Sequence, residues 1–369
     1  MGQIGMRPSN VSTLLVAMIR ARLPALLTGA PGIGKTQLVE QTAETCKADL
    51  IYFDCATSDN TRVEGMPWID AQSKEAQFFP FGDLARLLRA KKQTVGFFDD
   101  LGWASIGVQN SYGHLVHERR TPSGARLPDC VSIVAATNRR TDRAGVSGLS
   151  EAIKSRFASI IPVEPNLDDL CQWAIHKGEW MPSSIAFLRF RSELMHQFTP
   201  SQDIVNYPCP RTWDNADKIL KLGLPPAVEL GAVQGAVGEG PGAERLAFER
   251  IYRELPSLDA IMIDPDSAPI PETPATLYAV SIGLASKATE GNFGRVARYS
   301  ERLREHRCEQ HKGGLGEFGV LLVRDAVRRH NVEKIINGKT VITNKLASTP
   351  AFIELMSSEI GKLIAGEVS

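Results

Sequence analysis

Residues 24–36 read PALLTGAPGIGKT, and this stretch decides the fold. The run PALLTG (24–29) is apolar and ends in glycine, which is typical of a buried strand. The run TQLVEQTAETCKA (36–48) has the apolar spacing of a helix. Between them, GAPGIGKT (29–36) fits the pattern G-x-x-x-x-G-K-[ST]. A glycine-rich connection from a strand to a helix can cradle phosphates, so residues 29–36 are predicted to form a phosphate-binding loop for a nucleoside triphosphate.

The positions of this phosphate-binding loop have separate expected roles. Gly29, Gly32 and Gly34 let backbone N–H groups approach the phosphates at the start of a helix. Lys35 is expected to reach the β- and γ-phosphates, and Thr36 to hold Mg²⁺. We expect ATP as the nucleotide and Mg²⁺ as the cofactor. The expected nucleotide-binding residues are Gly29, Ala30, Pro31, Gly32, Ile33, Gly34, Lys35, Thr36 and Gln37.

The run TVGFFDD (94–100) supplies the acids that such a site requires. Asp99 follows an apolar strand and is expected to hold Mg²⁺, directly or through water. Asp100 would then polarise the attacking water. Without the preceding loop, the same residues would describe only a strand that ends in solvated acids.

Asn138 ends the strand-like run VSIVAAT (131–137). A polar amide at this place could orient the lytic water beside Asp100. Taken alone, an Asn at the end of a strand is more often a turn former. Its place in a series of polar strand ends favours the catalytic role.

Two arginines are candidates for stabilising charge during phosphoryl transfer. Arg156 lies in EAIKSRF (151–157), just before the last predicted strand, and Arg211 lies in CPRTW (209–213). Phosphoryl transfer benefits from an arginine on the developing charge, and a neighbouring subunit often delivers it. The alternative for either residue is a surface ion pair.

The surrounding pattern of apolar strands and helices predicts an α/β fold. Continuously apolar strands that alternate with helices indicate a parallel sheet covered on both faces, here the P-loop NTPase sheet sandwiched by helices. After about residue 166 the pattern is mostly helical, which predicts a helical lid and a mostly helical C-terminal region. We expect the core over residues 1–164, the lid over 165–225 and the C-terminal region over 226–369. Further predicted strands cover residues 49–56, 93–101, 130–138 and 159–165.

Composition limits the function classes. Lys plus Arg and Asp plus Glu both number 42, so the net charge is zero, which argues against a bulk nucleic-acid binder. The six cysteines are scattered without a CxxC pair, as in a reduced cytoplasmic protein. The apolar stretch at 11–27 is broken by Arg20 and Arg22, so we expect no membrane span.

The segment 96–157, from GFFDDLGW to IKSRF, resembles the AAA+ ATPases, and within them the MoxR and dynein-related branch. The resemblance covers essentially the whole chain and is strongest over residues 24–215. It implies a hairpin at about 119–128 before the sensor strand. It also implies a helix-2 insertion or pore-facing loop at EGMPWID (64–70).

The resemblance gives the site residues their family roles. It implies that Asp99 and Asp100 form Walker B, that Asn138 is sensor 1, that Arg156 is the arginine finger and that Arg211 is sensor 2. It further implies a homo-oligomer, a hexameric ring, that uses ATP to remodel or activate a protein partner. In MoxR relatives that partner commonly carries a von Willebrand factor A domain.

One departure from the family pattern leaves alternatives open. The usual Walker B ending is Asp-Glu, whereas this chain has Asp99-Asp100, whose second acid is one methylene shorter. A non-hydrolysing nucleotide switch is therefore one alternative. A nucleic-acid motor subunit, for restriction or packaging, is the other, and the zero net charge argues against it.

Overall fold

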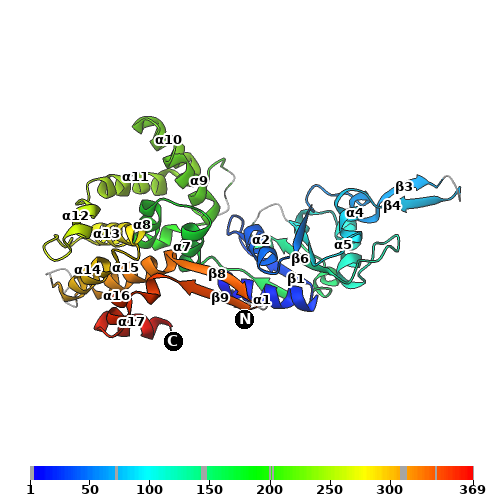
Figure 1. Cartoon of the computed structure of the whole chain (residues 1–369). Coiled ribbons are helices and arrows are strands. Elements are labelled where there is room, and N and C mark those ends of the chain that lie inside the picture. Colours follow the sequence, from blue (N-terminus) through cyan, green and yellow to red (C-terminus); the bar gives the residue numbers. More distant parts are fainter. Residues whose placement is uncertain are drawn as a thin grey trace. The chain divides into compact units, whose positions relative to one another are not determined.

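The apolar runs around the phosphate-binding loop form one five-stranded parallel sheet with the order β2-β5-β6-β1-β7. Figure 1 labels β1 and β6 of this sheet. Each strand pairs in parallel with its neighbours, so all five carboxyl ends lie along the same edge. The strands in chain order are β1 (Ala25–Thr28), β2 (Asp49–Asp54), β5 (Thr94–Asp99), β6 (Val131–Thr137) and β7 (Ser159–Pro162).

The computed structural model describes residues 4–70, 74–142, 148–198, 201, 203–307, 314–336 and 339–368, which fall into two units. Unit 1 comprises Met1–Asp169 with Phe198–Ile204, and unit 2 comprises Leu170–Gln197 with Val205–Ser369. The expected division into a core, a lid and a C-terminal region stays a prediction.

Alternating strand residues of unit 1 bury both faces of the sheet. On one face, Leu27 and Phe97 pack with the apolar sides of α1 (Pro8–Ala21) and α2 (Lys35–Thr45). On the other face, Leu26 and Phe98 pack with three further helices. These are α4 (Gly82–Leu88), α5 (Ile106–His117) and α6 (Glu151–Lys154). The prediction of a parallel sheet between two helical layers is confirmed.

The segment from residue 61 to 82 includes EGMPWID (64–70), where the resemblance implies a helix-2 insertion or pore-facing loop. It contains the short helix α3 (Thr61–Glu64) and an antiparallel hairpin of β3 (Met66–Ile69) and β4 (Ala76–Phe79). All eight strand residues are exposed, so no burial alternation marks these strands in the sequence. Residues 71–73 lie outside the described chain.

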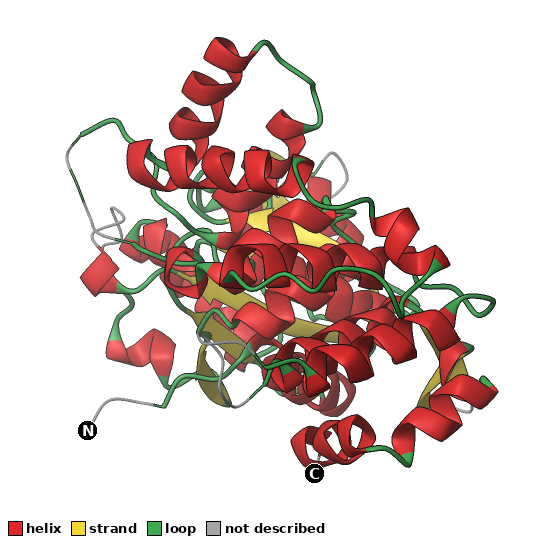
Figure 2. Ribbon diagram, turned by 90° about the vertical axis from the view of Figure 1, so that its left-hand side faces the viewer, coloured by secondary structure: helices red, strands yellow, loops and turns green. Residues whose placement is uncertain are grey.

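Unit 2 is mostly helical, as predicted for the chain beyond residue 166 (Figures 1 and 2). An apolar core of this unit joins side chains of α12–α17. One hairpin, β8 (Asn331–Ile336) with β9 (Lys339–Asn344), interrupts the helices. The helices are α7 (Leu167–His176, beginning in unit 1), α8 (Pro182–Phe190), α9 (Pro210–Leu220), α10 (Pro226–Val237), α11 (Glu239–Arg253), α12 (Leu258–Ile263), α13 (Pro274–Lys287), α14 (Phe293–Glu305), α15 (Gly316–Arg329), α16 (Pro350–Met356) and α17 (Glu359–Val368). Within the described ranges, every helix is too short or too polar to cross a membrane.

A buried ion pair joins α8 to α15 inside unit 2. Arg189 Nη2 donates to Asp325 Oδ1 at 3.0 Å and to Oδ2 at 3.1 Å, and both side chains are buried. Removing the carboxylate would leave a desolvated guanidinium, which is costly in a protein interior.

We therefore expect Asp325→Ala to lower the free energy of unfolding by about 3–5 kcal/mol. Urea titration followed by tryptophan fluorescence measures the loss. The exposed pair of Arg191 and Glu193 is the control, and Glu193→Ala should cost at most about 1 kcal/mol. Equal effects of the two substitutions would contradict a structural role for the buried pair.

Candidate functional site

The phosphate-binding loop joins the carboxyl end of β1 to the start of α2. Gly32 (φ 77°) and Gly34 (φ 91°) adopt the left-handed backbone region, which glycine enters without strain. A Cβ at Gly29 would lie 2.6 Å from Ile33 Cδ1 and 2.7 Å from the carbonyl oxygen of Val163, so a side chain there would clash. The loop backbone is thus free to bring its N–H groups to an anion at the start of an 11-residue helix.

Lys35 connects this loop to the end of a second strand. Its side chain is buried, and Nζ donates to the carbonyl oxygens of Gly29 and Ala30, both at 2.9 Å. Nζ also donates to Asn138 Oδ1 at 2.8 Å. Asn138 follows β6, which pairs with β1 so that Thr28 lies opposite Thr137. The parallel register therefore brings Lys35 and Asn138 together, although 103 positions separate them in the sequence.

Thr36 and Asp99 meet at the same edge of the sheet. Thr36 Oγ1 donates to Asp99 Oδ2 at 2.8 Å, and the Asp99 carboxylate is buried. A hydroxyl and a carboxylate are hard oxygen donors, the ligand types that Mg²⁺ prefers together with phosphate oxygens and water. These two residues fit a Mg²⁺ ion in their chemistry and their placement.

Asp100 follows β5 in a left-handed conformation, with φ 51° and ψ 37°. Asp is among the few residues other than glycine that visit this region routinely. The Asp100 N–H donates to Asp99 Oδ1 at 3.0 Å, which fixes the turn. The strand therefore ends at Asp99, and the turn places Asp100 at the carboxyl edge of the sheet.

Tyr52 is a site neighbour that the sequence did not single out. Its hydroxyl donates to Asp99 Oδ2 at 3.2 Å, across the pairing of β2 with β5. Burial, followed by the charge of Asp99, raises the pKa of Tyr52, so the phenol stays protonated and remains a donor. A tyrosine in the middle of β2 is visible in the sequence. Its contact with Asp99 follows only from the pairing of β2 with β5, which the sequence does not show.

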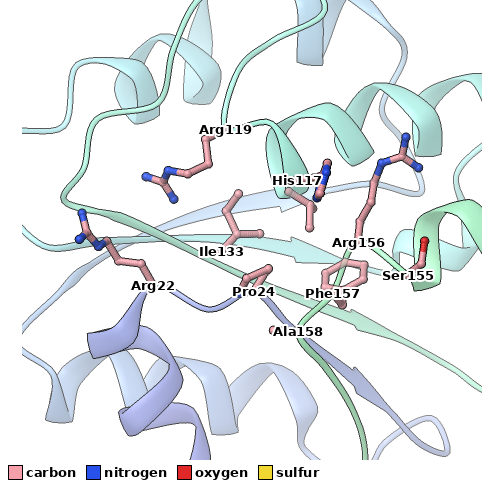
Figure 3. A pocket seen from close by; sticks show the side chains of 10 residues that line it. Arg22, Pro24, His117, Arg119, Ile133, Ser155, Arg156, Phe157 and Ala158 are labelled. Atoms are coloured by element: carbon pink, nitrogen blue, oxygen red, sulfur yellow. The ribbon is translucent and has the colours of Figure 1, made fainter.

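Arg156 lies at the opposite edge of the sheet. It lines a cavity of about 260 Å³ together with Pro24 and Ala158, which immediately precede β1 and β7 (Figure 3). Arg156 Nη1 donates to the carbonyl oxygen of Ala152 at 2.8 Å. From Pro24 to Gly29 the strand direction spans about 16 Å, because a parallel strand rises roughly 3.3 Å per residue. Arg156 therefore lies far from the loop, Asp99 and Asn138 of its own chain.

Arg211 occupies the first turn of α9 in unit 2, and its side chain is exposed. The helix begins with a capping box between Cys209 and Thr212. Burial of Thr212 and Trp213 fixes the helix face, which leaves Arg211 toward solvent. Its sensor 2 role stays a prediction.

Comparisons with known proteins agree with this reading of unit 1. Residues 24–157 match the family described as AAA domain (dynein-related subfamily). A stretch of 148 residues is 27% identical to Midasin from Giardia intestinalis, and it covers 38% of this chain but only 3% of that protein.

Two solved structures are similar to the chain at low identity. NtrX from Brucella abortus in complex with ATP is 13% identical, over 82% of this chain and 66% of that one, with a TM-score of 0.41. The Thermotoga maritima RuvB Holliday junction branch migration motor is 14% identical, over 92% of each chain, with a TM-score of 0.33.

Gly113, on α5, packs closely against the side chains of Ile153 and Arg156. A Cβ at Gly113 would lie 2.7 Å from Ile153 Cδ1 and 3.2 Å from Arg156 Cδ, so Gly113→Ala should lower the free energy of unfolding by about 1–3 kcal/mol. Gly107→Ala on the same helix is the control, since its Cβ would meet Asn60 only at 3.8 Å. That variant should be neutral or slightly stabilised. Thermal melts of both variants measure the difference, and equal melting temperatures would contradict close packing at Gly113.

Proposed function

We propose that this chain, whose residues 24–157 are an AAA domain of the dynein-related subfamily, binds ATP with Mg²⁺ and hydrolyses the ATP to ADP and phosphate. One observation carries the proposal. The bonds from Lys35 to Asn138 and from Thr36 to Asp99 join the loop to the ends of two neighbouring strands. A phosphate-binding loop, a hard-oxygen pair and an amide at one edge are the parts that phosphoryl transfer to water requires.

The residues of the loop would hold the triphosphate. Backbone N–H groups at the start of α2 favour anions, and Lys35 adds a buried cation beside them. To reach the terminal phosphates, Lys35 exchanges carbonyl and amide oxygens for phosphate oxygens, which are stronger acceptors. Thr36 and Asp99 would hold Mg²⁺, which neutralises charge on the phosphate oxygens when bound.

Asp100 and Asn138 would act on the attacking water. Asp100 directly follows Asp99 and would accept a proton from the attacking water. Asn138 accepts a hydrogen bond from Lys35 and would orient the attacking water beside Asp100.

Arg156 would serve a neighbouring copy rather than its own loop. It lies beyond the amino ends of β1 and β7, whereas the loop lies at the carboxyl end of β1. An arginine supplied in trans stabilises the charge that develops on the transferred phosphoryl group. A homo-oligomeric ring of six copies, with each site completed across an interface, is the assembly that this placement favours.

The work done with ATP is proposed from the family resemblance. Members of the MoxR branch remodel or activate protein partners, so we propose a cytoplasmic MoxR-like ATPase whose partner carries a von Willebrand factor A domain. The zero net charge supports a protein partner over nucleic acid. The Midasin match spans 3% of that protein, so nothing of its larger role is transferred.

Lys35→Ala should nearly abolish ATP turnover, because it removes the buried cation that faces the terminal phosphates. Release of phosphate from Mg-ATP measures the loss, and a melting curve confirms that the variant is folded. Lys91→Ala, at an exposed lysine before β5, is the matched control and should keep wild-type turnover. Wild-type turnover in Lys35→Ala would remove the proposed site.

Substitutions of Asp100 distinguish an ATPase from a nucleotide switch that does not hydrolyse ATP. Asp100→Asn should bind ATP and fail to release phosphate, because the amide cannot accept a proton from water. Asp100→Glu should keep or raise turnover, because it restores the family's usual side chain. Single-turnover phosphate release measures both. Normal hydrolysis by Asp100→Asn would show that Asp100 does not act on the water, and a wild-type chain that binds ATP without turnover would favour the switch.

Arg156→Ala should keep ATP binding but lose turnover by about a thousandfold, the usual contribution of a trans arginine. Mixing it with Lys35→Ala tests the shared site, because an intact loop meets an intact Arg156 only in mixed assemblies. Partial recovery of phosphate release is expected in the mixture. Full activity of Arg156→Ala alone would place the whole site within one chain.

A further inference from the structure

The Asp99 carboxylate accepts hydrogen bonds on both of its oxygens. Oδ2 accepts from Thr36 Oγ1 at 2.8 Å and from the Tyr52 hydroxyl at 3.2 Å. Oδ1 accepts from the Asp100 N–H at 3.0 Å. A carboxylate offers about four acceptor sites, two on each oxygen. Among the residues that the structure describes, these donors leave Asp99 with one further acceptor site, and that site is on Oδ1.

Tyr52 reaches Asp99 because of the register of β2 against β5. Tyr52 lies directly opposite Phe97, and Asp99 follows Phe97 by two residues on the same face of the sheet. Such a diagonal neighbour lies roughly 7–8 Å away, which an aromatic side chain can bridge. A shorter hydroxyl side chain at this position could not reach the carboxylate.

Packing fixes the ring of Tyr52. Its centroid lies 5.7 Å from the centroid of the Phe97 ring, with an interplanar angle of 63°, which is an edge-on aromatic contact. Phe97 is fully buried, so it is a firm surface for this contact. The ring of Tyr52 is thus held against the strand that carries Asp99, and its hydroxyl is a donor in a fixed place.

Tyr52 supports the carboxylate independently of the phosphate-binding loop. Thr36 belongs to that loop and is itself a proposed ligand of Mg²⁺, so its hydroxyl serves two partners. The Tyr52 hydroxyl and the Asp100 N–H lie outside the loop, and they bind different oxygens of Asp99. Together these two donors fix the rotation of the carboxylate whether or not the loop is occupied.

We propose that Tyr52 is a positioning residue for Mg²⁺. By holding Oδ2 of Asp99, it keeps the remaining acceptor site on Oδ1 available to the ion or to a water of its shell. The inference rests on the proposed function, in which Thr36 and Asp99 hold Mg²⁺. Groups that orient a metal ligand contribute to metal affinity, and their removal commonly lowers it by about tenfold or more. A hydroxyl that only stabilised the end of β2 would leave the Mg²⁺ requirement unchanged.

Tyr52→Phe tests the proposal, because it removes the hydroxyl and keeps the ring against Phe97. The variant should fold, since Tyr52 is 44% exposed on an edge strand, where water can hydrate the freed oxygen. Binding of a fluorescent ATP analogue is measured in EDTA and then over a range of Mg²⁺ concentrations. We expect unchanged affinity in EDTA and about a tenfold higher Mg²⁺ concentration at the midpoint of the Mg²⁺ effect. Tyr278→Phe, in unit 2, removes a phenol hydroxyl elsewhere and should titrate like the wild type.

Phosphate release over the same Mg²⁺ range separates positioning from a part in the chemical step. Tyr52→Phe should regain most of the wild-type turnover at saturating Mg²⁺, because Asp99 is still present to hold the ion. An unchanged Mg²⁺ midpoint in the variant would overturn the proposal and leave the ATPase standing. An equal loss of affinity in EDTA and in Mg²⁺ would also overturn it, since the hydroxyl would then support nucleotide binding without the ion. A wild-type chain that does not bind the analogue at any Mg²⁺ concentration would contradict the proposed ATPase, and this inference with it.

Discussion

The parallel pairing of β1 with β6 is the constraint on which the site depends. Thr28 lies opposite Thr137, so the phosphate-binding loop and Asn138 leave the sheet side by side. The hydrogen bond from Lys35 to Asn138 follows from this register. A slip of one residue would turn every strand side chain to the other face, which the two buried layers of the sheet prevent. The core that stabilises unit 1 thus also holds the phosphate-binding loop next to Asn138.

The parallel arrangement also divides the proposed site residues between two edges of the sheet. The loop, Asp99 and Asn138 are at the carboxyl edge, and Arg156 lies beyond the amino ends of the strands. No rearrangement within a parallel sheet brings these edges together, since a strand of four residues such as β1 already spans about 13 Å. The proposed role of Arg156 therefore requires a second copy.

Much of the site could be predicted from the sequence because its parts are short and contiguous. The loop at 29–36, the acids that end β5 and the amide that ends β6 each carry a local pattern, and parallel pairing alone places them together. The fold class followed from continuous apolar runs. The β3–β4 hairpin could not be predicted in this way, because its residues are exposed on both faces. The contact of Tyr52 with Asp99 and the cavity beside Arg156 also depend on residues far apart in the chain.

The central claim is that the ATPase site is complete only between two copies. ATP turnover per subunit, measured from dilute monomer to assembled protein, tests it most directly. We predict that turnover per subunit is very low in the monomer and rises steeply over the concentrations at which sedimentation shows assembly. A turnover per subunit that stays constant down to the dilute monomer would contradict the claim, because the site would then be complete within one chain.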